Sequence, residues 1–328
     1  MPRNSPLITL ITLLFIGVSL AAYALVRQPF DNAESYATWE GIGPDKWASV
    51  WLVRRYVSPE APINFYPAGS VDDDPDVIWI DVPHSTFNRD QSHTAFEKLL
   101  AHSKLNSEEL NRLAELIRSI EIGGWEVRSN PQAANLEEGF RDLHYRFGRE
   151  SVSFACYMAF FDSAMRAIGD NSIGARSPVA SLDCELSLEN STGVDALVPE
   201  IPIRNVLSRI GSGERVVFLD AREQPEYESG FIPGALNVKL RDVKKMDLSL
   251  VENADLIVPY CVKDFRGFEV ARALQRRGLN KVAILKPFGI RGWRSMKLPV
   301  AMPSEREVSL KKLSVCAADV EQCLRHPI

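Results

Sequence analysis

One cysteine of this chain lies in a setting that favours chemistry. Cys261 directly follows the apolar run Leu256–Tyr260, which predicts a strand, and a helix is predicted from Gly267 onward. A cysteine in a strand-to-helix loop is surrounded by backbone N–H groups, which favour an anion and lower the pKa of the thiol. Lys263 and Arg266 add positive charge. The loop therefore suits a thiolate or persulfide nucleophile beside a bound anion, with an inert buried cysteine as the alternative.

The elements around this loop predict a parallel sheet. The hydrophobic pattern gives, in order, a helix over 203–210, strands over 216–219 and 256–260, a helix over 267–277 and a strand over 281–285. Strands that alternate with helices form parallel α/β sheets. We therefore predict an α/β domain over 200–300. A linker over 170–199 precedes it and a helical tail over 301–328 follows it.

Several motifs in this domain resemble those of a single rhodanese domain, which is a sulfurtransferase fold. They are the segments Asp220–Arg222, Glu226–Tyr227, Gly230–Asn237, Cys261–Arg266, Gly289–Trp293 and Leu298–Val300. The resemblance implies a parallel sheet flanked by helices and no cofactor. It also implies that Cys261 carries a sulfane sulfur as a persulfide and passes it to a nucleophilic acceptor.

The same resemblance assigns roles to individual residues. Cys261 and Arg266 would be catalytic, with Arg266 and the loop N–H groups binding the anionic donor and steadying the persulfide. The other substrate-binding residues would be Val262, Lys263, Asp264, Phe265 and Gly267. Asp220 and Arg222 resemble the structural polar pair of the family, so we expect them to contribute to stability rather than chemistry.

The length and composition of the loop bear on its activity. Four residues separate Cys261 from Arg266, as in the rhodanese loop, whereas the related cysteine phosphatases have five. Phosphatase activity is therefore the less favoured alternative. Phe231 stands where the rhodanese family usually has His, and Asp264 stands where its loop commonly has Gly. Asp tolerates positive φ, so the loop should still close. Its carboxylate would oppose anionic donors such as thiosulfate, which leaves open a non-catalytic sensor or binding protein for an oxyanion or a partner protein.

A first block over 46–169 has no catalytic motif that its residues alone reveal. Helices are predicted over 47–56, from Ser107 and over about 150–168, and strands over 63–66 and 77–82. Segments 51–61, 80–83, 113–117, 131–134 and 161–164 resemble the chromate-resistance exported-protein domain (ChrB C-terminal-like). The resemblance implies a mixed, helix-rich α/β domain and a link to chromate or another oxyanion. Arg54 and Arg55 are candidate anion-binding residues, with a solvated or salt-bridged surface as the alternative.

The N-terminal segment predicts export. Residues 7–26 form an uncharged run that is long enough to span a bilayer as a helix. Ala22–Ala24 offers a signal-peptidase site, so residues 1–27 are either a signal peptide or a membrane anchor. Residues 28–45 would form a polar spacer. The globular domains would then lie outside the cytoplasm, in the periplasm or at the membrane.

The net charge and the histidines exclude two classes of partner. The formal net charge of −5 provides no basic surface for nucleic acid. His84, His93 and His102 fit no standard ligand spacing, so no metal site is predicted. The partners we expect are a small sulfur-containing anion or a thiol acceptor, an oxyanion ligand and, through the N-terminal segment, a membrane.

The remaining cysteines are assigned no chemistry. Cys156 lies in an apolar helix and is predicted to be a small core side chain, and Cys184 falls in the linker. Cys316 and Cys323 lie about two helical turns apart, which is too far to bridge within one straight helix. If the tail bends, an oxidising compartment would allow them to pair. Cys261 would then be the thiol that must stay free.

Overall fold

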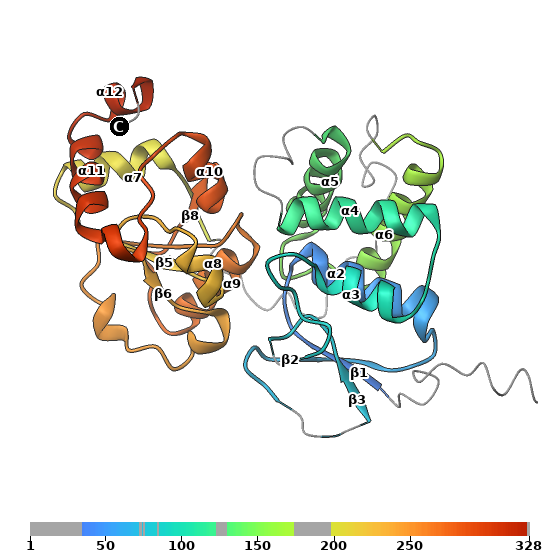
Figure 1. The fold of residues 1–328 in the computed structure, drawn as a ribbon. Helices are drawn as coiled ribbons and strands as arrows, with labels where there is room; N and C mark the ends of the chain where they lie inside the picture. Colours follow the sequence, from blue (N-terminus) through green and yellow to red (C-terminus); the bar gives the residue numbers. More distant parts are fainter. Residues whose placement is uncertain are drawn as a thin grey trace, which may run out of the picture.

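The computed structural model of the chain describes residues 35–326 except 72–73, 75, 84, 123–129 and 174–197. These residues form two α/β domains that lie side by side (Figure 1). The predicted signal or anchor segment and most of the predicted linker lie outside the described residues. Within the described ranges, no helix is long and apolar enough to cross a membrane.

The first domain contains a three-stranded parallel sheet in the order β2-β1-β3. Its strands are β1 (Ser35–Trp39), β2 (Ile63–Tyr66) and β3 (Val77–Trp79). The prediction of a polar spacer over 28–45 is wrong for β1, because this strand is the centre of the sheet and Tyr36, Ala37, Thr38 and Trp39 are buried.

Helices cover one side of this sheet (Figure 1). They are α2 (Pro44–Leu52), α3 (Ala95–His102), α4 (Glu108–Glu121), α5 (Pro131–Phe147) and α6 (Phe154–Gly169). α2 continues as the π-helix η1 (Val53–Val57) and ends before Pro59, as the sequence predicts. The hydroxyl of Ser107 accepts a hydrogen bond from the N–H of Leu110, which confirms the predicted start of α4.

The second domain contains the predicted parallel sheet. β5 (Val216–Asp220) pairs with β6 (Leu236–Asn237) and with β7 (Leu256–Tyr260), and β4 (Glu200–Pro202) pairs with β8 (Ile284–Lys286). A parallel bridge between Ile257 and Val282 links the two strand groups. The flanking helices are α7 (Ile203–Gly211), α8 (Gln224–Glu228), α9 (Phe265–Arg276) and α10 (Gly289–Ser295), and short 3-10 turns lie at η4 (Leu240–Asp242) and η5 (Leu248–Leu250).

The tail is helical, and it bends at Asp319. The turn η6 (Pro303–Glu305) leads into α11 (Arg306–Ala318), and α12 (Val320–Arg325) follows. Asp319 has φ −137° and ψ 83°, which interrupts the helix. Cys316 and Cys323 are thereby brought within 5.0 Å between their Cα atoms and form a disulfide, as the sequence allows for a bent tail. Cys156 is buried in the core of the first domain, as predicted, and it is also disulfide-bonded, which the sequence did not predict.

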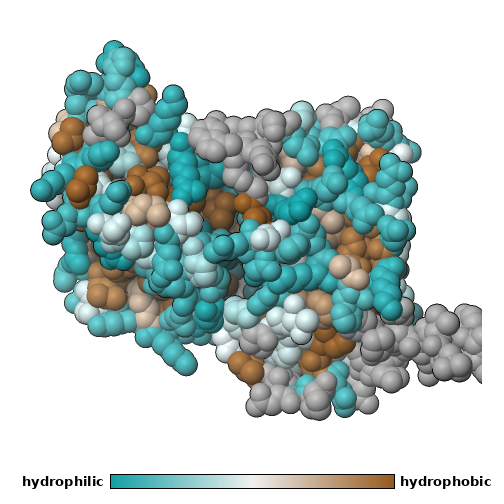
Figure 2. Space-filling model, in the orientation of Figure 1, coloured by the Kyte–Doolittle hydropathy of each residue, from teal (hydrophilic) through white to brown (hydrophobic). Residues whose placement is uncertain are grey.

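The surface is largely hydrophilic on the face that Figure 2 shows, with hydrophobic residues in small patches. The apolar side chains are instead gathered in the two domains, where Trp47 stacks on Tyr157 in the first domain at 3.7 Å between ring centroids. In the second domain, the rings of Phe218 and Trp293 pack edge to face. The functional features of the molecule are therefore sought in its clefts.

Candidate active site

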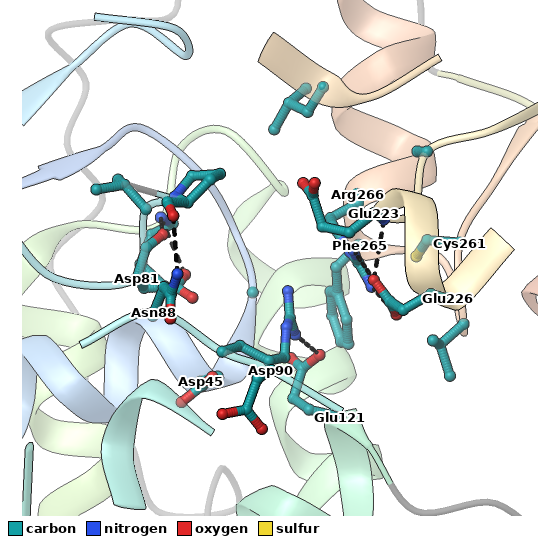
Figure 3. A pocket seen from close by; sticks show the side chains of 18 of the residues that line it. Asp45, Asp81, Asn88, Asp90, Glu121, Glu223, Glu226, Cys261, Phe265 and Arg266 are labelled. Carbon is teal, nitrogen blue, oxygen red and sulfur yellow. Dashed lines mark hydrogen bonds and ion pairs between the residues drawn. The ribbon is translucent and has the colours of Figure 1, made fainter. Parts of the chain in front are cut away.

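Cys261 lies where the sequence predicts, directly after β7 and shortly before α9. Its side chain is free and 3% exposed. It lines a cleft of about 720 Å³ to which both domains contribute (Figure 3). A cleft of this volume suits an organic ligand of moderate size.

The start of α10 holds the backbone of the Cys261 loop. The N–H groups of Ile290 and Arg291 donate to the carbonyl oxygens of Cys261 and Val262, at 2.9 and 3.1 Å. In a trans peptide the N–H points opposite to the C=O, so the N–H groups of Val262 and Lys263 point away from α10. This orientation supports the predicted ring of N–H donors around the cysteine. The N–H of Gly267 also donates to the sulfur of Cys261.

Burial dominates the acidity of the Cys261 thiol. Removal from water raises its pKa above the ordinary value of 9.0, and the carboxylates of Asp264 and Glu121 add to this effect. Arg266 and the N–H of Gly267 act in the opposite direction but do not outweigh burial. The prediction of a lowered thiol pKa is therefore wrong, because the thiolate is poorly solvated in this cleft.

We expect the alkylation of Cys261 by iodoacetamide to be slow at neutral pH and to keep accelerating above about pH 9, because only the thiolate reacts. Mass spectrometry of the Cys261 peptide would give the rate from about pH 6 to about pH 10, with the urea-unfolded chain as the control. The control should level off at lower pH than the folded protein. A folded-state rate that levels off first would contradict the raised pKa.

Arg266 lies close to Cys261, but its guanidinium group is bound to a carboxylate. Its two terminal nitrogens donate to Glu226 of α8 at 2.9 and 3.0 Å (Figure 3). Although burial opposes ionisation, the charge of Arg266 holds the pKa of Glu226 below its ordinary value. The guanidinium group of Arg266 thus faces Glu226. To contact an anionic donor, this group would have to bind the donor and Glu226 at the same time.

Lys263 and Asp264 point toward the first domain. Asp264 is 1% exposed and accepts hydrogen bonds from Arg141 at 2.5 Å and from Arg149 at 2.8 Å. Lys263 forms an ion pair with Glu137 of α5. Arg141 and Arg149 compensate much of the charge of Asp264, although its carboxylate still adds to the raised pKa of the Cys261 thiol. The φ of Asp264 is −133°, so the loop does not need the positive φ that we considered.

Other contacts along α9 join the two domains. Glu269 accepts a hydrogen bond from the N–H of Ile42 at 2.7 Å, and Arg272 donates to Glu150 at 2.8 and 3.0 Å. Burial raises the pKa of Glu269 to about 7. The predicted loop residue Phe265 lies at the start of this helix and packs edge to face on a ring of the first domain. The helix that follows the cysteine therefore also forms the domain interface.

The first domain supplies the opposite wall of the cleft, which sequence reasoning missed. Its charged lining residues include Asp45, Lys46, Asp81, Arg89 and Glu121 (Figure 3). Lys46 pairs with Asp81 at 3.1 Å, and Arg89 pairs with Glu121. Burial raises the pKa of Asp45 to about 7. These residues belong to no common motif. The only sequence feature near Asp45 and Lys46 that could have drawn attention to them is the Gly43-Pro44 turn at the start of α2.

Asp220 and Arg222 form the pair that the sequence predicts. Both are buried, and Arg222 donates to the carboxylate of Asp220 at 2.6 to 3.2 Å. Arg222 also donates to the carbonyl oxygen of Gly230 at 2.8 Å. The pair thereby ties the end of β5 to the segment after α8, in keeping with a structural role.

Arg54 and Arg55 do not reach the cleft. Arg55 donates to both carboxylate oxygens of Asp162, at 3.0 and 2.7 Å, so its charge is compensated. Arg54 donates to the carbonyl oxygen of Pro59 and lies over the ring of Phe154. The salt-bridged alternative thus describes Arg55, and anion binding at these two residues stays a prediction.

Two family models match the chain. Residues 36–168 match the ChrB C-terminal domain, and residues 204–296 match the rhodanese-like domain. The chain thus joins a ChrB C-terminal domain to a rhodanese-like domain. The order is the one that its motifs predicted, and the cleft around Cys261 lies between the ChrB domain and the rhodanese domain.

The rhodanese domain is similar to known proteins. Over 105 residues the chain is 32% identical to YrkF of Bacillus subtilis (strain 168), a candidate sulfur carrier protein, with 32% of this chain and 56% of YrkF covered. The chain thus spans about half the length of this relative.

Solved structures with a similar domain include two rhodanese-type proteins. The human single-domain sulfurtransferase TSTD1 is 23% identical, covers 30% of this chain and 96% of its own, and has a TM-score of 0.26. A rhodanese-related protein from Thermoplasma volcanium is 20% identical, covers 32% and 98%, and has a TM-score of 0.28.

Proposed function

We propose that this protein is a sulfurtransferase that carries sulfane sulfur as a persulfide on Cys261. The observation that carries the proposal is the free Cys261 thiol, placed between β7 and α9 in a rhodanese-like domain and opening on a cleft. The similarity to YrkF, which is named as a candidate sulfur carrier, supports it.

The proposed reaction has two displacement steps. Cys261 first loses its proton, and the thiolate attacks the outer sulfur of a donor such as thiosulfate or an organic persulfide. A new S–S bond forms at Cys261 while the S–S bond of the donor breaks, and sulfite or a thiolate leaves with the electron pair. An acceptor thiolate then attacks the outer sulfur of the persulfide and releases the Cys261 thiolate. The sum needs no external oxidant or reductant.

The backbone of the loop would stabilise the persulfide anion. The N–H groups of Val262 and Lys263 are held away from α10, and the Gly267 N–H already bonds the sulfur. Fixed N–H donors stabilise developing negative charge without having to reorganise. Because burial raises the pKa of the thiol, this stabilisation is what would make the charged state accessible.

We also propose that the protein is exported and that the ChrB domain links it to chromate or another oxyanion. The uncharged segment 7–26 supports export. Cys156, Cys316 and Cys323 are disulfide-bonded, which is typical of oxidising compartments. Intact-mass measurement of periplasmic and membrane fractions would test export and cleavage, and a reduced full-length chain in the cytoplasm would contradict it.

The persulfide itself is the test of the proposed activity. After incubation with thiosulfate or a polysulfide, we expect intact-mass spectrometry to show the addition of one sulfur atom to the wild type. The Cys261→Ser variant should show no addition, and peptide mapping should place the sulfur on Cys261. If no donor loads the wild type, the sulfurtransferase proposal is wrong.

One observation favours a binding role instead. Both terminal nitrogens of Arg266 are occupied by Glu226, and the thiol pKa is raised. If the protein only senses an oxyanion or a partner, the Cys261→Ser substitution should leave its ligand affinity unchanged. The wild type should then never acquire sulfur. The same loading experiment therefore separates the two functions.

A further inference from the structure

A second pocket of about 290 Å³ adjoins the Cys261 cleft. The two cavities share Val262, which follows the cysteine directly, and they also share Arg89, Glu121 and Glu226. The second pocket is lined in addition by arginines from the rhodanese domain. A ligand in it would lie beside the loop that holds the thiol.

The carboxylates near this pocket already have partners. Glu121 pairs with Arg89, and Glu226 accepts both hydrogen bonds of Arg266. Asp90 pairs with Lys98 at 2.8 Å. The negative charges that line the pocket are therefore each compensated by a different cation.

Arg294 is different, because within the described ranges its guanidinium group contacts carbonyl oxygens and no carboxylate. It donates to Ser229 at 3.4 Å and to Gly230 at 3.5 Å, which are long hydrogen bonds. The carbonyl oxygen of Gly230 is shared with Arg222, which donates to it at 2.8 Å. Two guanidinium groups thus approach one oxygen. Burial, and then the charge of Arg222, lower the pKa of Arg294.

Arg291 lies near Arg294 and already donates to the carbonyl oxygen of Ser119 at 3.5 Å. It lies one helical turn before Arg294 on α10, and residues three apart share a helix face. Both side chains line the pocket, together with Ser229 and Ser295. Guanidinium groups bind oxyanions through pairs of charge-assisted hydrogen bonds.

We propose that this pocket binds a small tetrahedral oxyanion, with Arg294 as its main charged donor and Arg291 as a second one. Arg222 is already paired with Asp220, whereas an anion here would give the guanidinium group of Arg294 a charged partner. The sulfonate half of a donor such as thiosulfate and the chromate ion share this chemistry. The inference stands apart from sulfur transfer, because binding needs no reaction at Cys261.

Isothermal titration calorimetry of the full-length Cys261→Ser variant with sulfate, thiosulfate and chromate tests the site. We expect one site per chain, and we expect Arg294→Gln in the same background to weaken binding about tenfold or more, as for a lost charge-assisted hydrogen bond. Arg294→Lys should retain part of the affinity. Lys297→Gln is the matched control, since it removes one exposed positive charge just beyond α10, and it should change the affinity less than about twofold.

The outcomes separate the sources of the anion and the two proposals. Tighter binding of thiosulfate than of chromate would assign the pocket to a sulfur donor, and the reverse would assign it to an oxyanion of the chromate type. The proposal is overturned if none of the three anions binds. It is also overturned if the Arg294→Gln variant, shown to be folded by its thermal melt, binds the anions with the same affinity as the Cys261→Ser parent. An equal loss in Lys297→Gln would overturn it too. Loading of sulfur on Cys261 in the wild type is measured separately and can fail without affecting this result.

Discussion

The Asp264→Ala variant is expected to lose about 3 kcal/mol of unfolding free energy, because it leaves two arginines without their shared buried carboxylate. Asp264 is 1% exposed, and the side chains of Arg141 and Arg149 are 12% and 13% exposed. Removal of one partner from a buried pair costs about 3–5 kcal/mol. We expect the lower end, because Arg141 keeps Glu137 at 2.8 Å and Arg149 keeps Glu200 at 3.3 Å.

Urea unfolding followed by circular dichroism would measure this loss. Asp142→Ala is the matched control, because Asp142 is an exposed acid next to Arg141, and its loss should stay within about 0.5 kcal/mol. Asp264→Asn should fall between the two, since it keeps the shape but not the charge. If Asp264→Ala were as stable as the control, the carboxylate would not join the domains.

The effect of Asp264 should also depend on pH. Burial opposes its ionisation, but Arg141 and Arg149 hold its pKa below the ordinary value of 3.8. A group with a depressed folded-state pKa stabilises the protein above its unfolded pKa, and this contribution is lost as the pH falls through the folded-state value. The difference between wild type and Asp264→Ala should therefore be full at neutral pH and shrink below about pH 4.

The fold of the rhodanese domain could be predicted because its signals are local. β7 has the predicted bounds, and the apolar run before Cys261 is buried throughout. β1 was missed because Ser-Tyr-Ala-Thr-Trp is short and carries three hydroxyl residues, and because it lies in a polar, turn-rich stretch. Thr38 can be buried there because its hydroxyl accepts a hydrogen bond from Lys46 at 3.1 Å. That partner compensates a polar group that composition alone counts as exposed.

The site was predictable only up to the loop itself. Cys261 directly follows β7, as the motif predicts, whereas the next helix begins at Phe265, so that Arg266 and Gly267 lie in the first turn of α9. The direction of Asp264 is set instead by Arg141 and Arg149, which lie more than one hundred residues earlier in the chain. The sequence shows an acid in place of the usual glycine, but no local pattern identifies the arginines that compensate its charge.

Gly289, the first residue of α10, packs directly against the backbone of the Cys261 loop. A Cβ at Gly289 would lie 2.0 Å from the carbonyl oxygen of Lys263, 2.5 Å from that of Cys261 and 2.6 Å from that of Val262. These are backbone atoms of the Cys261 loop, so the loop must move if the side chain is added. The φ of Gly289 is +60°, which adds about 1 kcal/mol of backbone strain for alanine.

Gly289→Ala is therefore expected to lower the rate of sulfur loading on Cys261 by tenfold or more, since the N–H donors would shift from the sulfur. Gly278→Ala is the matched control, because Gly278 also has a positive φ, +87°, but nothing lies within 4 Å of its Cβ position. It should cost about 1 kcal/mol of stability and leave loading unchanged. Intact-mass time courses with thiosulfate would compare the two variants. Equal loading in both would mean that close packing of α10 on the loop does not shape the site, whereas a loss confined to Gly289→Ala ties persulfide formation to that contact.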